Sequence, residues 1–199
     1  MPTAEEIIRH FDDDPDGIEW VGVDPPRQPI KVVEPDPAWP VQFEVLAARI
    51  RRALGNRALA VEHVGSTSVP DLAAKPIIDI DVTVADPCDE SSYVPDLEAA
   101  GFRLRLREPG WHEHRLIVAD DPRVNVHVFG AGSPEVIRHR MLRDWLSEHP
   151  DDRERYAAAK RTSAEASNRV GGVVGDYNQR KQPVVRDILD RMFRAHGLL

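Results

Sequence analysis

The stretch that decides the fold reads EHVGSTSVPDLAAKPIIDIDV, from Glu62 to Val82. Two β-type runs, 58–64 and 76–84, flank a Gly-Ser turn, and twelve residues separate that turn from the first aspartate. Asp79 and Asp81 are two residues apart on the second run, so both carboxylates leave the same face of a strand. The stretch therefore predicts two strands, with paired carboxylates on one face of the second.

The turn itself is suited to binding an anion. Gly65 and Ser66 follow a strand, where the backbone can turn tightly and present N–H groups and a hydroxyl to a phosphate. We expect Thr67 and Ser68 to belong to the same phosphate-binding loop. A short helix predicted over 68–74 would add its N-terminus to that site.

The two aspartates require a positive charge between them. Mg²⁺ or Mn²⁺ meets that need, because hard divalent ions take oxygen ligands and can bridge Asp79 and Asp81 to triphosphate oxygens. The alternative is an Asp-x-Asp pair on a solvated strand face.

The rest of the chain changes from mixed to helical patterning at Gly130. Strands are predicted at 30–33, 102–107, 113–119 and 124–129, and helices at 1–10, 38–54, 134–148, 151–169 and 177–195, with a further helix ending at 97–101. We expect residues 1–28 to form an arm and 29–199 one domain, with a sheet-containing core over 29–130 and a helical tail over 133–197. The predicted fold class is α+β: a small mixed sheet backed by helices, with a C-terminal helical bundle.

The composition limits the kind of protein and its partners. The 199 residues carry a net charge of −8, with 41% hydrophobic and 30% charged residues, as in an ordinary globular protein. An acidic surface disfavours sequence-independent nucleic-acid binding. No run approaches the ~18 apolar residues of a membrane span, so no membrane partner is expected. The single cysteine, Cys88, and a beginning without a signal pattern lead us to expect a cytoplasmic location.

Several segments resemble known proteins. Gly-Ser, about a dozen residues, then Asp-hydrophobic-Asp-hydrophobic resembles the signature of the DNA polymerase β-like nucleotidyltransferase superfamily. The longer string 62–80 resembles the GrpB family in particular. Residues 32–43 resemble that family's opening, and 143–160 its helical tail. The resemblance covers about 30–195 and implies a nucleotidyltransferase-like fold.

The superfamily resemblance also implies a third carboxylate from a neighbouring strand. The strand predicted at 124–129 places Asn125 and His127 on one face, and neither is acidic. His127 is thus the candidate for the catalytic base or a third metal ligand, and a nitrogen ligand would favour Mn²⁺ over Mg²⁺. A hydrogen-bonded strand histidine is the alternative. A three-histidine site formed with His112 and His114 is a further arrangement.

Basic residues would balance the phosphate charge. Lys75 stands at the mouth of the acidic strand. The family resemblance adds Lys160 and Lys181 of the helical tail, which are otherwise typical of solvated helix faces. Three arginines alternate on one predicted strand face and either reach a polyphosphate or cap a sheet edge: Arg103, Arg105 and Arg107.

Three functions stay open at this point. The first is a metal-dependent nucleotidyltransferase that uses a nucleoside triphosphate and an acceptor that the sequence does not identify. The second follows from the resemblance, because related units occur attached to dephospho-CoA kinase: a non-catalytic nucleotide-binding or accessory module that acts with a protein partner. The third is a toxin–antitoxin component that modifies another protein.

Overall fold

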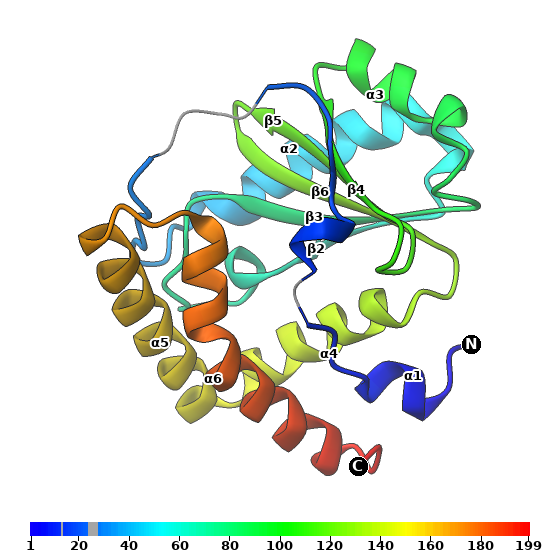
Figure 1. The fold of residues 1–199 in the computed structure, drawn as a ribbon. Coiled ribbons are helices and arrows are strands. Elements are labelled where there is room, and N and C mark those ends of the chain that lie inside the picture. Colours follow the sequence, from blue (N-terminus) through cyan, green and yellow to red (C-terminus); the bar gives the residue numbers. More distant parts are fainter. Residues whose placement is uncertain (13, 24–27) are drawn as a thin grey trace.

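The fold is built on one small mixed sheet. A computed structural model describes residues 1–12, 14–23 and 28–199. In it a six-stranded sheet has the order β1-β4-β5-β6-β3-β2 (Figure 1). The strands are β1 (Glu19–Trp20), β2 (Ala60–Val64), β3 (Ile78–Val84), β4 (Arg103–Glu108), β5 (His114–Asp120) and β6 (Arg123–Gly130). β3 and β6 are parallel, and the other neighbouring pairs are antiparallel.

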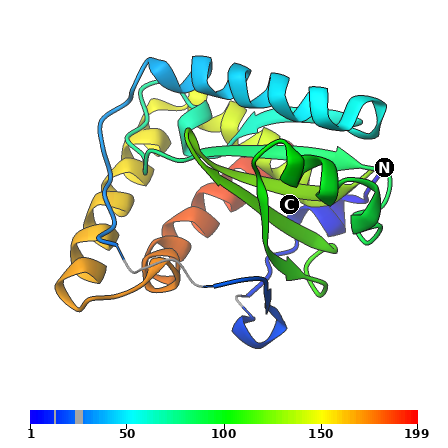
Figure 2. The same ribbon diagram turned by 90° about the horizontal axis from the view of Figure 1, so that it is seen from above.

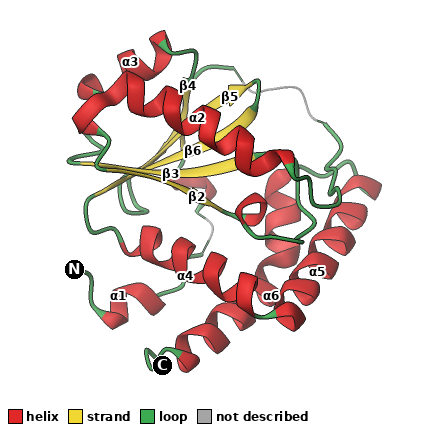
Figure 3. Cartoon of the chain, turned by 180° about the vertical axis from the view of Figure 1, so that it is seen from behind, coloured by secondary structure: helices red, strands yellow, loops and turns green. Residues whose placement is uncertain are grey.

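Helices cover both faces of the sheet. They are α1 (Ala4–Ile8), α2 (Ala38–Leu54), α3 (Val94–Ala99), α4 (Pro134–Glu148), α5 (Pro150–Arg169) and α6 (Val174–Ala195). Figure 3 shows α2 and α3 on one face and α4 on the other. α5 and α6 form a helical pair beside α4 at one end of the sheet (Figure 2). The predicted α+β class and the C-terminal helical bundle are confirmed.

Alternation along the central strands separates an apolar face from a polar one. Ile78, Ile80 and Val82 of β3 are fully buried and belong to the same apolar cluster as Leu46 and Ile50 of α2. The residues between them on β3 therefore face α4. This alternation is what turns both aspartates toward the helical half of the molecule.

Two predicted elements are wrong. Residues 30–33 form no strand: Asn168 of α5 takes up the backbone N–H and C=O of Ile30, at 2.8 Å and 2.9 Å, and only Val33 makes an isolated bridge, to Ala74. Residues 68–74 form no helix, because a single 3-10 turn ends at Ser68 and the left-handed φ of +60° at Asp71 is incompatible with a helix.

The N-terminal segment contacts both halves of the molecule. Ile7 of α1 is buried in a cluster with residues of α6, and β1 extends the sheet beside β4. β1 has only two residues and was not predicted. Residues 13 and 24–27 of the predicted arm lie outside the described residues. Across the described ranges, no helix combines the length and apolar character needed to cross a membrane.

Candidate functional site

The two aspartates lie together on the β3 face that α4 covers. The Asp81 side chain is fully buried, whereas that of Asp79 is 27% exposed. His139 of α4 places Nδ1 3.1 Å and 2.9 Å from the two Asp81 carboxylate oxygens. Asn125 of β6 donates from Nδ2 to Asp79 Oδ1 at 2.9 Å. One aspartate is thus held by a helix, and the other borders the accessible side of the site.

The surroundings of His139 favour its protonated form. Burial alone would lower its pKa, but the charge and hydrogen bond of Asp81, with a contribution from Glu135, raise the pKa to about 9. Sequence reasoning missed His139 because a histidine on an amphipathic helix has no local feature that distinguishes a carboxylate partner from solvent.

A third carboxylate of this face was also missed. Glu62 on β2 is the register partner of Asp81 in the antiparallel β2–β3 pair, so the two side chains leave the same face. Arg140 of α4 donates to Glu62 Oε2 at 2.8 Å. Consecutive residues of α4, His139 and Arg140, therefore neutralise carboxylates of neighbouring strands. Only the strand register reveals this pairing.

The Gly-Ser turn lies against Asp79. Gly65 has a left-handed φ of +67°, and a Cβ there would come within 2.5 Å of the Asp79 carboxylate, so only glycine fits. Thr67 is buried, with its hydroxyl 3.1 Å from His63 Nε2, and the Ser68 hydroxyl donates to the Gly65 carbonyl at 2.6 Å. Both hydroxyls are engaged within the protein, and their part in a phosphate-binding loop stays a prediction.

A small cavity of about 50 Å³ lies between the turn and the helices. Gly65 and Ser66 line one side of it, and His139, Arg143 and Tyr156 are among the residues on the other. The cavity thus joins the turn, α4 and α5 at the aspartate face.

Two of the three predicted histidines, His114 and His127, lie together near the aspartates, and His112 lies apart from them. His127 of β6 has Nε2 3.7 Å from Asp79 Oδ1, beside the aspartates. His114 of β5 lies behind it, with Nε2 3.0 Å from His127 Nδ1. Burial keeps the pKa of His114 at about 4 despite its contact with Glu108. His112 precedes β5 and packs its ring against Phe11, so the three-histidine site does not form.

The three predicted lysines converge from distant parts of the chain. Lys160 of α5 is 2% exposed, with Nζ 4.3 Å from the centre of the Tyr156 ring. Lys181 of α6 lies over both Tyr156 and Tyr177, and Lys75 lies over Tyr177. The ring faces attract the ammonium groups but accept no strong hydrogen bond.

These lysines repel one another and are buried at a cost. Burial and then Lys181 lower the pKa of Lys160 to about 6, while the negative charge of Asp79 opposes them. Burial likewise lowers the pKa of Lys75, again opposed by Asp79. Within the described ranges the Lys160 Nζ has no hydrogen-bond partner. Lys160 therefore presents an uncompensated hydrogen-bonding group beside the aspartate face.

The arginine row lies elsewhere. β4 is separated from β3 by β5 and β6, and Arg103 and Arg107 of β4 are bound to Asp120 and Glu90 at 2.8 Å and 2.6 Å. Arg105 donates to the Val23 carbonyl at 2.9 Å. These arginines support the edge of the sheet and do not reach the aspartates.

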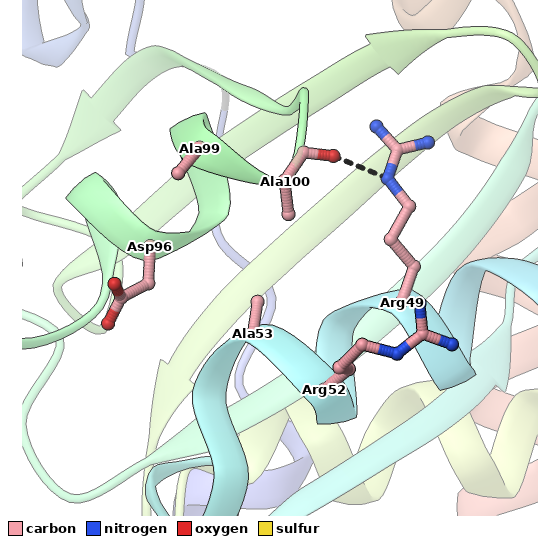
Figure 4. Close-up of a pocket in the computed structure, with 6 residues that line it drawn as sticks. All are labelled: Arg49, Arg52, Ala53, Asp96, Ala99 and Ala100. Carbon is pink, nitrogen blue, oxygen red and sulfur yellow. Dashed lines mark hydrogen bonds between the residues drawn. The ribbon is translucent and has the colours of Figure 1, made fainter.

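The larger hollow in the surface lies on the other side of the sheet. It measures about 400 Å³ and lies between α2 and α3 (Figure 4). Two of its polar side chains are already engaged: Arg49 Nε donates to the Ala100 carbonyl at 2.6 Å, and Asp96 pairs with Arg57 at 2.6 Å. The lining offers no set of catalytic groups, so the aspartate face is the better candidate.

The donor set at the aspartates suits a divalent ion that arrives with phosphate. Among the residues that the structure describes, no three His, Cys, Asp or Glu side chains are grouped to hold a metal ion by themselves. Mg²⁺ ordinarily binds through one or two carboxylates and completes its shell with substrate phosphates and water. Asp79 and Asp81 fit that mode, provided that an incoming ion replaces His139 at Asp81.

Comparison with known proteins shows the family of this chain. The family model described as "GrpB protein" matches residues 29–191, which include both aspartates and all three clustered lysines. The chain belongs to the GrpB family. The "UPF0157" protein of Halalkalibacterium halodurans is 48% identical over 167 residues, which is 84% of each chain.

Relatives of two further kinds are informative. The crystal structure of "conserved protein GrpB" from Enterococcus faecalis superposes with a TM-score of 0.68 at 30% identity, over 82% of this chain and 99% of that one. A dephospho-CoA kinase of Mycolicibacterium paratuberculosis is 36% identical over 191 residues, covering 83% of this chain but 46% of the kinase. The GrpB unit thus occurs both alone and as about half of a longer protein.

Proposed function

We propose that this GrpB protein is a metal-dependent nucleotidyltransferase that binds a nucleoside triphosphate between the aspartates of β3 and the lysines of α5 and α6. The reaction would break the bond between the α- and β-phosphates, join the α-phosphate to an acceptor oxygen and release pyrophosphate. The acceptor is unassigned, and we place the reaction in the cytoplasm.

The buried amino group of Lys160 is the observation that carries the proposal. An ionisable group that is 98% removed from solvent, without a hydrogen bond, costs stability unless a ligand compensates it. Lys75 and Lys181 flank it, and three of the four lysines in the chain thus meet at one place. A polyphosphate supplies the oxygen acceptors and negative charge that this cluster lacks.

The remaining groups take roles that follow from their positions. Gly65 and Ser66 turn the backbone close to Asp79, where a phosphate can approach N–H groups. Asp79 and Asp81 would hold the divalent ion, which supplies charge stabilisation at the phosphate oxygens when bound. His127 would occupy the place of the third carboxylate and assist the acceptor hydroxyl. The present cavity is smaller than the roughly 300 Å³ of small ligand pockets, so we expect binding to widen it.

Calorimetric titration with ATP, GTP, CTP and UTP, each with Mg²⁺ and then with Mn²⁺, tests the proposal. We expect binding that depends on the metal, is lost in Asp79→Asn/Asp81→Asn and survives in Lys31→Met. Lys31 is the fourth lysine and lies outside the cluster, so its variant is the matched control for the loss of one positive charge. Transfer is then sought with radiolabelled nucleotide and cell extract. Absence of binding for all four nucleotides would reject both the site and the reaction.

The second candidate is a non-catalytic nucleotide-binding or accessory module with a protein partner. The similarity to part of a dephospho-CoA kinase favours it, as does the absence of an acidic residue at the His127 position. It predicts nucleotide or CoA-type binding at the same lysines but no transfer with any metal. Metal-dependent binding without turnover in extracts would select this candidate.

A further inference from the structure

A chain of polar side chains crosses the sheet behind His127. Glu108 at the end of β4 has Oε2 2.6 Å from His114 Nδ1. His114 Nε2 is 3.0 Å from His127 Nδ1, and His127 Nε2 is 3.7 Å from Asp79 Oδ1. The chain thus runs across four strands, β4, β5, β6 and β3, from a partly exposed carboxylate to the candidate site.

The hydrogen positions along this chain follow from what each group can do. An ionised carboxylate only accepts, so the hydrogen of the first contact belongs to His114 Nδ1. A neutral imidazole carries one hydrogen, which leaves a lone pair on His114 Nε2. That lone pair can only accept from His127 Nδ1–H. In a neutral His127, the lone pair is then on Nε2, on the side of Asp79.

We propose that Glu108 and His114 are positioning residues that fix His127 in its Nδ1–H tautomer, so that the Nε2 lone pair is directed into the aspartate site. Only the role of this lone pair rests on the proposed function. In that function Nε2 would accept a proton from the acceptor hydroxyl or would bind a divalent ion. The tautomer itself is a property of the ligand-free protein.

The competing interaction is weaker. Asp79 would favour a hydrogen on His127 Nε2, but its oxygen at 3.7 Å lies beyond hydrogen-bond distance and already accepts from Asn125. The two contacts behind His127 are shorter, and His114 is 2% exposed, so water does not replace them.

Aromatic rings pack around this Glu108–His114–His127 chain (the relay) and fix the positions of the two histidines. His114 stacks on His127 with ring centres 5.1 Å apart, and Trp111 and Phe129 pack against His114 at 4.8 Å and 4.9 Å. A hydrogen-bond acceptor that orients a functional histidine through its other ring nitrogen is a common arrangement at metal and catalytic sites, and here the acceptor is His114 Nε2.

Long-range ¹H–¹⁵N correlation spectra of histidine-labelled protein measure the tautomer directly. At about pH 8, where an ordinary imidazole is neutral, we expect His127 to show a protonated Nδ1 and an unprotonated Nε2. Signals are assigned by their loss in His127→Gln and His114→Gln. A hydrogen on His127 Nε2, or hydrogens on both nitrogens of His114, would overturn the inference.

Three variants separate positioning from simple structural support. His114→Phe keeps the stacked ring but removes the acceptor, so His127 should change to the Nε2–H tautomer. His114→Gln retains an acceptor oxygen and should keep the original tautomer. Glu108→Ala changes a half-buried residue and should shift the tautomer without unfolding, whereas Glu98→Ala on α3 should not. An unchanged His127 in both His114→Phe and Glu108→Ala would reject the relay.

Metal selectivity supplies the second measurement. If His127 donates its lone pair to the ion, His114→Phe should lower ATP affinity with Mn²⁺ by about 10-fold and affinity with Mg²⁺ by less. The two proposals fail differently. The expected tautomer without nucleotide binding would refute the transferase and leave the relay standing, and nucleotide binding with the opposite tautomer would do the reverse.

Discussion

Two clusters of positive charge in this molecule differ in how they are compensated. Near the β4 edge of the sheet, Arg107 and Arg115 both donate to Glu90, and Arg103 pairs with Asp120. Under the helical tail, Lys160 Nζ lies over the Tyr156 ring and has no hydrogen-bond partner among the described residues, and its two neighbouring lysines also lie over tyrosine rings. The arginines are paired within the fold, whereas the Lys160 amino group has no hydrogen-bond partner in the described part of the chain.

The choice of residue type agrees with this difference. Arginine stays charged and binds carboxylates through a planar fork, which suits permanent ion pairs. Lysine loses its proton readily when buried, as the pKa of about 6 at Lys160 illustrates. The buried Lys160 can therefore remain mostly neutral until an anion arrives. The comparison favours the lysine cluster over the arginine row as the proposed ligand site.

The largest effect that this comparison predicts is on nucleotide affinity. Lys160→Met should weaken ATP binding by about 100-fold, because a charge-assisted contact contributes about 2–3 kcal/mol. Met keeps the apolar stem, so the fold should survive. Titration calorimetry of Lys160→Met beside Lys31→Met measures the difference. Equal affinities in the two variants would remove the lysine cluster from the nucleotide site.

Local sequence pattern was enough for most of the fold. Period-two alternation predicted β3 and β6, and the 3.6-residue spacing predicted α2 and the three tail helices. It failed at 30–33, where Asn168, 138 residues away in sequence from Ile30, takes the backbone hydrogen bonds that a strand would need. β1, with two residues, is too short to produce a period.

The candidate site was predictable only in part. The spacing of Asp79 and Asp81 on a strand showed that they share a face, and the family resemblance singled out Lys160 and Lys181. His139 could not be found in this way, because its contact with Asp81 depends on how α4 docks on the sheet. Local propensity contains no information about such docking.

The next largest effect concerns the arginine side of the comparison. Glu90→Gln leaves Arg107 and the 7% exposed Arg115 without their carboxylate, and should lower the free energy of unfolding by about 2 kcal/mol. ATP affinity should stay unchanged, because this cluster is far from the aspartates. Urea unfolding and calorimetry test both parts. A loss of ATP affinity at constant stability would reverse the assignment of the two clusters.

The dependence of stability on pH gives a smaller effect. Burial lowers the pKa of Lys160 from 10.5 to about 6, so between those values the unfolded chain binds the extra proton. The free energy of unfolding should therefore rise with pH across this window, by about 1 kcal/mol per pH unit from this group. His139, whose pKa is raised to about 9, contributes with the opposite sign between 6.5 and 9.

The difference in unfolding free energy between the wild type and Lys160→Met isolates the contribution of Lys160 to the pH dependence. Wild type and Lys160→Met share His139, so subtracting their unfolding free energies at about pH 7 and about pH 9 leaves the Lys160 term. We expect the wild type to gain stability relative to the variant as pH rises. Parallel pH profiles would mean that Lys160 is charged in the ligand-free protein and has a compensating partner.

The smallest effect is expected at the exposed end of the arginine row. Arg103 and Asp120 pair at 2.8 Å but are 52% and 74% exposed, so solvent screens their attraction. Arg103→Ala should change the free energy of unfolding by about 0.5 kcal/mol or less. Its ATP affinity should equal that of the wild type. A drop in ATP affinity comparable to that of Lys160→Met would mean that β4 contributes to the site, and the distinction between satisfied arginines and unsatisfied lysines would then no longer locate the ligand.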